Sequence, residues 1–236
     1  MEKKKIWMIA LLVLGFGMMA YDKLSTPPTI QGNWDISQQI LDNGYSQYLV
    51  VEPDFDWDNP EIYRLAGEIK QRTNSPEEAI KETITYVVKN VQYSSKVSVE
   101  YCYDEKASTV LEAGFGDCVS MARLALALLR AQGIPARTMG GCLSFSSRCT
   151  PLFSIYPKVD AMVTPMTMGD FKKRGFLHEW VEVWTPNENW RIIEATSGQI
   201  FPLTCNAYIP YAYDYNSYDR CVIQDQQFWD LCSQNQ

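Results

Sequence analysis

A cysteine, a histidine and a glutamate stand in this chain in an order that suits thiol chemistry. Cys118 follows Gly116 and Asp117, and an apolar run begins directly after it. His178 is the single histidine among the 236 residues, and Glu194 follows it further along the chain. The thiolate is the reactive form of cysteine, an imidazole can accept and return its proton, and a carboxylate can orient the imidazole. These three residue types together predict nucleophilic catalysis by a cysteine.

The residues around Cys118 predict the start of a helix. Asp117 is a residue type that caps helix N-termini, and Gly116 frees the chain for the turn before it. The run 119–132 is apolar nearly all round, as expected for a helix buried against a sheet, and Gly133 ends it. Cys118 then lies in the first turn, where the positive end of the helix dipole favours a thiolate. A free cysteine among apolar residues is also commonly an inert core residue, so the helix alone does not decide its role.

Two strands are predicted around the histidine and the glutamate. Residues 176–184 and 190–194 are rich in tryptophan, valine and isoleucine, and the turn-forming residues 185–189 join them. Side chains alternate between the two faces of a strand. His178 and Trp180 are therefore expected on one face of a hairpin.

The register of this hairpin decides whether the histidine meets the glutamate. If Trp184 pairs with Trp190, Glu194 lies opposite Trp180 and diagonal to His178, at about 7–8 Å between backbones. A glutamate side chain can bridge that separation. A slip of one residue would place Glu194 on the opposite face.

Together these blocks resemble the transglutaminase-like superfamily of papain-like thiol enzymes. The matching segments are Gly-Asp-Cys at 116–118, the end of the apolar helix at 132–137, His-Glu-Trp-Val-Glu-Val at 178–183 and Trp-Arg-Ile-Ile-Glu-Ala-Thr at 190–196. Upstream, Ser-Pro-Glu-Glu at 75–78 caps a helix that runs to residue 91, and an aromatic residue, Tyr93, follows it as is usual in the family. The resemblance spans about residues 60–200. It departs from the family at Glu194-Ala195, where aspartate before proline is usual.

The resemblance implies an α+β, papain-like fold, with the nucleophile at the N-terminus of a buried helix packed on an antiparallel sheet. It also implies acyl transfer through a thioester, in which Cys118 attacks an amide carbonyl, His178 transfers the proton and Glu194 orients the imidazole. The backbone N–H of Cys118 is the natural oxyanion donor, and Tyr93 is a candidate for the second. Neither a cofactor nor a metal is expected.

Two classes of function remain open from the sequence. The first is an enzyme that acts on a peptide or protein, where water as the second substrate gives a protease or amidase and an amine gives a crosslinking transglutaminase. We favour hydrolysis, because an amine needs a dedicated binding site and no sequence feature indicates one. The second class is a catalytically silent binding module of the same fold, which would hold a cell-surface polymer.

Composition and charge limit the partners. The chain is 46% hydrophobic and 13% aromatic, enough for one sizeable core. It carries 21 basic and 28 acidic residues, for a net charge of −7. Such a surface repels phosphate backbones, and no basic patch interleaved with aromatic residues is present, so nucleic acid is not an expected partner.

The N-terminus predicts export. Lys3, Lys4 and Lys5 precede the apolar run 6–20, which is short for a full membrane span of roughly twenty residues. A cleaved signal peptide and an uncleaved membrane anchor both remain open, and either places the rest of the chain outside the cytoplasm. The expected organisation is a signal peptide or anchor at 1–25, an irregular lead-in at 26–60, a transglutaminase-like domain at 61–204 and a Tyr/Cys-rich extension at 205–236.

The cysteine count agrees with an oxidising compartment. Of seven cysteines, setting aside the candidate nucleophile leaves an even number that suits three disulfides. These six are Cys102, Cys142, Cys149, Cys205, Cys221 and Cys232. Their connectivity is open from the sequence. A zinc site is disfavoured, because there is no Cys-x-x-Cys pair and the one histidine already has a role.

Overall fold

The computed structural model describes residues 30–94, 106–143, 176–205 and 208–213. The helices, including two short 3-10 turns, are α2 (Ser37–Asp42), η1 (Ser46–Leu49), η2 (Pro53–Phe55), α3 (Pro60–Arg72), α4 (Pro76–Asn90), α6 (Ala107–Ala113) and α7 (Cys118–Ala131). The strands are β1 (Gln92–Tyr93), β2 (Phe115–Gly116), β3 (Ala136–Leu143), β4 (Phe176–Thr185), β5 (Asn189–Glu194), β6 (Gln199–Pro202) and β7 (Tyr208–Tyr213).

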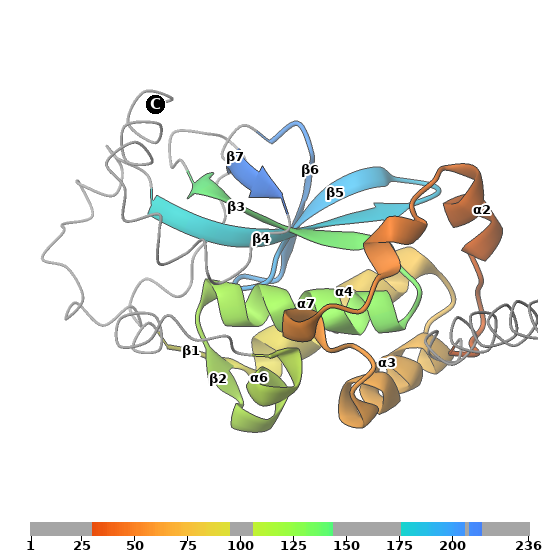
Figure 1. Cartoon of the computed structure of the whole chain (residues 1–236), viewed down its shortest axis with the longest axis horizontal. Coiled ribbons are helices and arrows are strands. Elements are labelled where there is room, and N and C mark those ends of the chain that lie inside the picture. Colours follow the sequence, from red (N-terminus) through yellow and green to blue (C-terminus); the bar gives the residue numbers. More distant parts are fainter. Residues whose placement is uncertain (1–29, 95–105, 144–175, 206–207, 214–236) are drawn as a thin grey trace, which may run out of the picture.

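Helices and strands form separate layers, as the sequence predicts. The larger sheet has five strands in the order β6-β5-β4-β3-β7, and every pairing in it is antiparallel. α7 lies beneath this sheet, with α3, α4 and α6 on its other sides (Figure 1). A second, parallel pair of strands, β1 and β2, leads into α7. The predicted α+β fold, with a buried helix on an antiparallel sheet, is confirmed.

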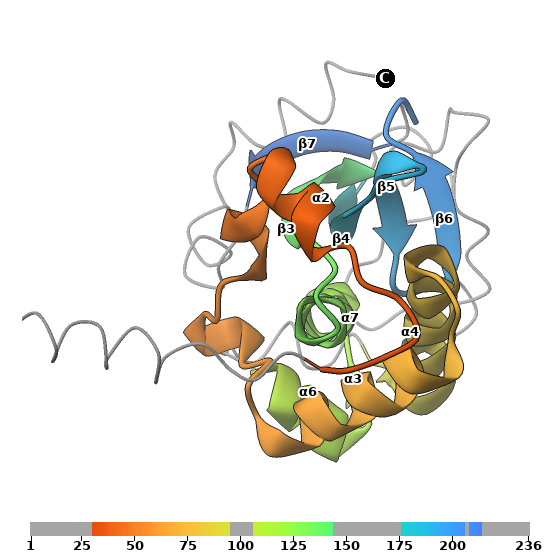
Figure 2. The same cartoon turned by 90° about the vertical axis from the view of Figure 1, so that its right-hand side faces the viewer.

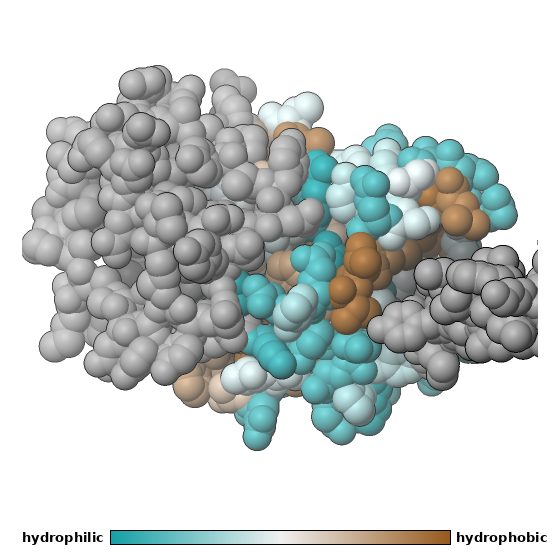
Figure 3. Space-filling model, in the orientation of Figure 1, coloured by the Kyte–Doolittle hydropathy of each residue, from teal (hydrophilic) through white to brown (hydrophobic). Residues whose placement is uncertain are grey.

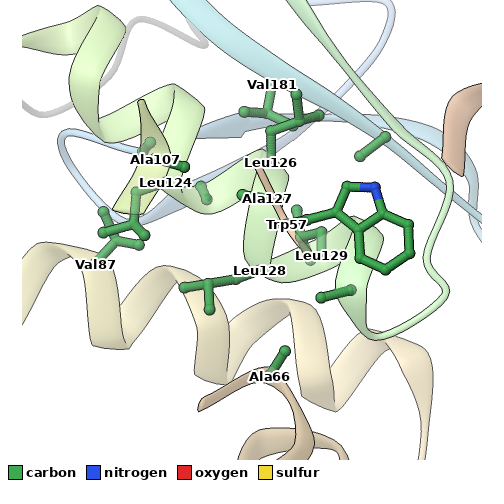
Figure 4. Close-up of a cluster of buried hydrophobic side chains, with 14 of the residues drawn as sticks. Trp57, Ala66, Val87, Ala107, Leu124, Leu126, Ala127, Leu128, Leu129 and Val181 are labelled. Carbon is green, nitrogen blue, oxygen red and sulfur yellow. The ribbon is translucent and has the colours of Figure 1, made fainter. Parts of the chain in front are cut away.

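α7 is the centre of the core. Every residue from Val119 to Ala131 is buried, and a view along its axis shows the sheet curving over it with helices around the remainder (Figure 2). Its leucines contact Val181 of β4 on one side, and Val87 of α4 and Ala66 of α3 on the other (Figure 4). A helix that is apolar all round forms stably only when neighbours cover each face, which is what this arrangement provides.

The β4–β5 hairpin has the register that the sequence predicts. Trp184 pairs with Trp190, and Val181 with Ile193. Each strand is one residue longer at the turn than expected, because the ladder extends to Thr185 and Asn189. Asn189 adopts a positive φ of 55°, a conformation that asparagine tolerates better than most residues and that lets the loop close.

Residues 30–60, predicted as an irregular lead-in, are folded onto the domain instead. They contain α2, η1 and η2, and bury Ile30, Phe55 and Trp57 in the main core. We call residues 52–56 the acidic strap, because alternate carboxylates there bind the helical layer. Glu52 lies 2.7 Å from Arg130 of α7, and Asp54 lies 3.4 Å from Arg123 of the same helix.

Asp56 completes the acidic strap at the neighbouring helix. Its carboxylate accepts hydrogen bonds from the backbone N–H and the hydroxyl of Ser108 at the start of α6. The strap therefore fixes α6 and α7 relative to each other. Its partners lie far along the chain, which is why local patterns did not reveal it.

The C-terminal side also contributes to the sheet. β7, which falls within the predicted extension 205–236, pairs with β3 at the sheet edge. The predicted signal peptide or anchor at 1–25 lies outside the described residues, and the division into four segments stays a prediction. No helix in the described part of the chain is both long and apolar enough to span a membrane. The described surface seen in Figure 3 is largely hydrophilic, with small separate apolar areas.

Candidate active site

Cys118 is the first residue of α7, as the Gly-Asp-Cys pattern predicts. The Asp117 carboxylate accepts the backbone N–H groups of Val119 at 3.0 Å and Ser120 at 3.1 Å. This cap satisfies two of the N–H groups that every helix N-terminus leaves without a helical partner. It does not use the N–H of Cys118. The cap thus leaves a donor beside the thiol at the positive end of the helix.

Gly116 is required by packing against this first turn. A Cβ added at Gly116 would lie 2.4 Å from the Cβ of Ser120, closer than side chains approach in real structures. The glycine therefore lets β2 run against the start of α7. Tyr93 lies on the parallel neighbour β1, paired with Gly116, and the N–H of Ser94 donates to the Gly116 carbonyl at 2.8 Å. The structure thus brings the predicted oxyanion candidate Tyr93 next to the Gly-Asp-Cys segment.

His178 and Glu194 meet across the hairpin. The His178 Nε2 and Glu194 Oε2 atoms are 2.6 Å apart, and both side chains are almost fully buried. An ionised carboxylate can only accept, so Nε2 carries the proton and donates it to Glu194. The His178 ring also stacks on Trp180, with centroids 6.5 Å apart. The same-face arrangement predicted from the register is what brings the imidazole and the carboxylate together.

The electrostatics of this pair favour its charged form. Burial alone would lower the pKa of the imidazole, but the charge of Glu194 and hydrogen bonds with Cys118 and Glu194 raise the pKa of His178 to about 10. Burial opposes ionisation of Glu194 too, yet the charge of His178 and hydrogen bonds from His178 and Thr196 hold the pKa of this carboxyl below its ordinary value. Both shifts favour an imidazolium beside a carboxylate.

Cys118, His178 and Glu194 thus form one connected group. The imidazole has two nitrogens, and Nε2 contacts Glu194, so Nδ1 is the nitrogen left to act with Cys118, which helps to raise the pKa of His178. The N-terminal end of α7 and the start of β4 lie at the same end of the molecule (Figure 1). A thiol, a proton carrier and its orienting carboxylate in this order can activate a nucleophile and protonate a leaving group.

Thr196 is the residue at this site that the sequence analysis left without a role. Its hydroxyl donates to Glu194 Oε1 at 2.6 Å, and its backbone N–H donates to the same atom at 3.1 Å. A hydroxyl residue two positions after a predicted orienting carboxylate was the signal that could have identified it, since serine and threonine hydroxyls form local hydrogen bonds in turns.

Cys118 is a free thiol, and the described cysteine Cys205 is buried and disulfide-bonded. The side chain of Cys142 is not described, and Cys102, Cys149, Cys221 and Cys232 lie outside the described residues. The pairing of all six into three disulfides therefore stays a prediction. Among the described residues, no group of histidine, cysteine, aspartate and glutamate side chains could hold a metal ion.

Comparisons with known proteins agree with this geometry. The family profile of the transglutaminase-like superfamily matches residues 63–195, which include Cys118, His178 and Glu194. A comparison with curated proteins finds no significant match. Among solved structures, a candidate cysteine protease from Cytophaga hutchinsonii aligns with a TM-score of 0.56 and 20% identity, over 82% of this chain and 54% of that one. This likeness indicates a shared fold.

Two further structures align less completely. The periplasmic domain of TgpA from Pseudomonas aeruginosa gives a TM-score of 0.45 and 19% identity, over 66% of this chain and 48% of that one. Red sea bream transglutaminase gives a TM-score of 0.37 and 14% identity, over 72% of this chain and 28% of that one. The chain spans about half the length, or less, of the solved chains it matches.

Proposed function

The chain belongs to the transglutaminase-like superfamily, and from this premise we propose that it is a thiol enzyme that cleaves an amide bond through a thioester on Cys118. The observation that carries the proposal is the buried 2.6 Å contact between His178 Nε2 and Glu194 Oε2, with Cys118 close enough to help raise the pKa of the same imidazole. A purely structural histidine has no need of a free thiol at a helix N-terminus on its other side.

The first half of the reaction forms the thioester. In the reactive form, a thiolate of Cys118 beside the charged His178 attacks the amide carbonyl carbon and forms a C–S bond. The carbonyl electron pair moves onto oxygen, where the Cys118 N–H and a donor at Tyr93 would stabilise the developing charge. As the intermediate collapses, the C–N bond breaks and His178 gives its Nδ1 proton to the departing amine.

The second half releases the product. Neutral His178 now accepts a proton from water as the water oxygen attacks the thioester carbon. Collapse of that intermediate breaks the C–S bond, which yields a carboxylic acid and restores the thiolate beside an imidazolium. Glu194 stays ionised throughout, holds Nε2–H in place and stabilises the imidazolium, as the carboxylate of a catalytic triad does.

We favour water over an amine as the second substrate. An amine acceptor needs a binding site of its own, whereas water is always present. The proposed substrate is a peptide or protein, or a cell-surface polymer that contains amide bonds. The proposed location is outside the cytoplasm, with the chain secreted or held by its N-terminal segment. The support for that location is the lysine-led apolar run at 6–20 and the even number of cysteines beside Cys118.

Trapping of the acyl-enzyme tests the proposal. The wild-type chain would be mixed with a library of amide-bearing peptides and glycan-peptides at pH 6–7, quenched in acid and measured by intact mass. We expect a mass increase on Cys118 that disappears on prolonged incubation as water completes the cycle. His178→Ala and Cys118→Ala should show none, and Glu194→Gln should show slower acylation.

The same experiment separates enzyme from binding module. A primary amine is added to the reaction. If the amine is incorporated into the product, the reaction is crosslinking by acyl transfer and not hydrolysis. If wild type, His178→Ala and Cys118→Ala all remain unmodified while each still binds a surface polymer, the catalytically silent binding module takes the place of the enzyme.

A further inference from the structure

Glu194 is held from two sides, and only one of them is the histidine. Oε2 contacts His178 Nε2 at 2.6 Å, while Oε1 accepts the hydroxyl of Thr196 at 2.6 Å and its backbone N–H at 3.1 Å. All three side chains are buried, with Glu194 fully excluded from solvent. The two carboxylate oxygens thus have separate tasks.

The turn after β5 sets this geometry. Residues 195–198 connect β5 to β6, and the N–H of Gly198 donates to the Glu194 carbonyl at 2.9 Å. Gly198 has a φ of 77°, which glycine adopts at no steric cost, so the turn closes tightly. Inside such a turn, Thr196 presents both its N–H and its hydroxyl back toward the side chain of Glu194.

A glutamate needs this support more than a shorter carboxylate would. It has one more rotatable bond than aspartate, and its terminal torsion has only broad preferences. Two donors on Oε1 fix the plane of the carboxylate and leave Oε2 directed at the imidazole. Hydrogen bonds to the ionised form also favour that form, and they offset the burial that would otherwise favour a neutral Glu194.

We propose that Thr196 is a positioning residue, which holds Glu194 ionised and oriented so that a glutamate can serve as the orienting carboxylate of the site. The catalytic part of this inference rests on the proposed function. Its physical part concerns only the protonation of the His178 imidazole. Glu194 and Cys118 are the titratable groups that raise the pKa of His178. Loss of the Thr196 hydroxyl should therefore reach the imidazole through Glu194.

The single histidine of the chain makes this measurable. Imidazole nitrogen resonances of the ¹⁵N-histidine-labelled full chain would be followed from pH 5 to 11. Wild type should keep a charged imidazole until about pH 10. Thr196→Val keeps the backbone N–H and the side-chain shape but removes the hydroxyl, and we expect its midpoint to fall by at least about one pH unit.

Two matched variants control the test. Thr196→Ser restores a hydroxyl and should return the midpoint to within about 0.3 units of wild type. Ser197→Ala removes the neighbouring hydroxyl of the same turn, which bonds Gln199 at 3.1 Å, and should leave the midpoint unchanged. A Thr196→Val midpoint equal to wild type, with only the melting temperature lowered, would overturn the proposal and leave Thr196 as a turn residue.

If Thr196→Val does not fold, a measurement on the wild-type chain still tests the proposal. In wild type, the Thr196 amide proton should lie downfield and move as Glu194 is protonated in acid; a resonance that ignores that titration would contradict the proposal. The two claims also fail separately. Absence of acylation with a shifted His178 midpoint in Thr196→Val would reject the enzyme but keep the positioning role, and acylation without that shift would do the reverse.

Discussion

The two ends of α7 are completed in different ways. At the N-terminal end the only side-chain cap described is the Asp117 carboxylate, which binds the N–H groups of Val119 and Ser120 and leaves that of Cys118. At the C-terminal end the backbone folds back on itself. Gly133, with a φ of 82°, donates to the Arg130 carbonyl at 2.9 Å, a common helix stop.

Buried side chains then close the C-terminal end further. Lys70 Nζ donates to the Gln132 carbonyl at 2.9 Å, and its ammonium lies 4.4 Å from the centroid of the Trp34 ring. The Gln132 amide donates to the Thr83 hydroxyl and to the Leu128 carbonyl, each at 2.9 Å. The C-terminal end of the helix is therefore tied into the core, while at the N-terminal end the proposed nucleophile Cys118 and its backbone N–H lie outside the Asp117 cap.

This difference indicates that one end of α7 serves mainly stability and that the other end carries the residue proposed to react. Under the proposed function, α7 must hold Cys118 in a fixed place while the thiol itself stays able to react. The structure meets both demands by fixing α7 at the end remote from Cys118 and along its length through the acidic strap. Changes at the two ends should consequently have separable effects, and the predictions below test that separation.

The largest effect is expected at the chemical end. His178→Ala should lower the rate of Cys118 alkylation by iodoacetamide at pH 6 by about 10²-fold, because the thiol loses the cation that favours its reactive anionic form. Glu194→Gln should lower it less, since the imidazole remains. The measurement is alkylation followed by peptide mapping under non-reducing conditions. Discovery of Cys118 in a disulfide, or equal rates in all variants, would contradict the proposed site.

Lys70→Met should act on stability alone. It keeps most of the buried chain length but leaves the Gln132 carbonyl without its donor, at a cost of about 1–3 kcal/mol in the free energy of unfolding. Urea denaturation measures this, with Lys89→Met on the exposed end of α4 as the control. Cys118 alkylation of the folded protein should stay within about twofold of wild type. A rate loss as large as that of His178→Ala would show that the ends are not separable.

Gly116→Ala should disturb both properties moderately. The added Cβ conflicts with the Ser120 Cβ, so the first turn of α7 must shift at a cost of about 1–3 kcal/mol. The shift moves Cys118 relative to His178, and alkylation should slow by about tenfold. Gly114→Ala is a useful contrast, because there the strain is in the backbone (φ 68°) and no atom lies closer than 3.5 Å. If Gly114→Ala slows alkylation and Gly116→Ala does not, the packing argument is wrong.

The smallest effect is expected from pH, through the change in unfolding free energy per pH unit. Because the pKa of His178 is raised to about 10, its stabilising contribution is complete below its ordinary pKa near 6.5 and is lost as pH rises toward 10. Glu194 has a lowered pKa, so its contribution is lost as pH falls through the acid range. Unfolding free energy should decline on the alkaline side by at most about 1.4 kcal/mol per pH unit. Denaturation of wild type against Glu194→Gln isolates this, and parallel profiles would count against a charged pair.

Local signals explain how much of the site could be predicted from the sequence. Asp117 as a cap and Trp184 opposite Trp190 depend on residues a few positions apart, and both held in the structure. The hydrogen bonds from Thr196 to Glu194 are equally local, but the sequence did not predict them, because a threonine in a turn can play many common roles. The position of Cys118 relative to His178 and Glu194 could be learned only from the structure, because it depends on how α7 packs against β4.

The fold of residues 30–60 could not be predicted, for a different reason. Two partners of the acidic strap, Arg123 and Arg130, lie on a helix whose sequence is mostly apolar. The Glu52–Arg130 contact joins residues 78 positions apart, beyond the reach of any pattern in a short window. From the sequence alone, an aspartate-rich stretch that contains proline is typical of an exposed loop. Its contacts with buried arginines become evident only in the structure.

The complete burial of α7 also bears on the order of events in folding. A helix of 14 residues is marginal in water on its own, and this one exposes apolar groups on every side until the sheet and three helices surround it. Its partners are drawn from both sides of it in the sequence, since α3 and α4 precede it and β3 and β4 follow it. During synthesis α7 must therefore wait for the hairpin that carries His178, and a chain halted before β4 would leave the apolar surface of α7 exposed and prone to aggregation.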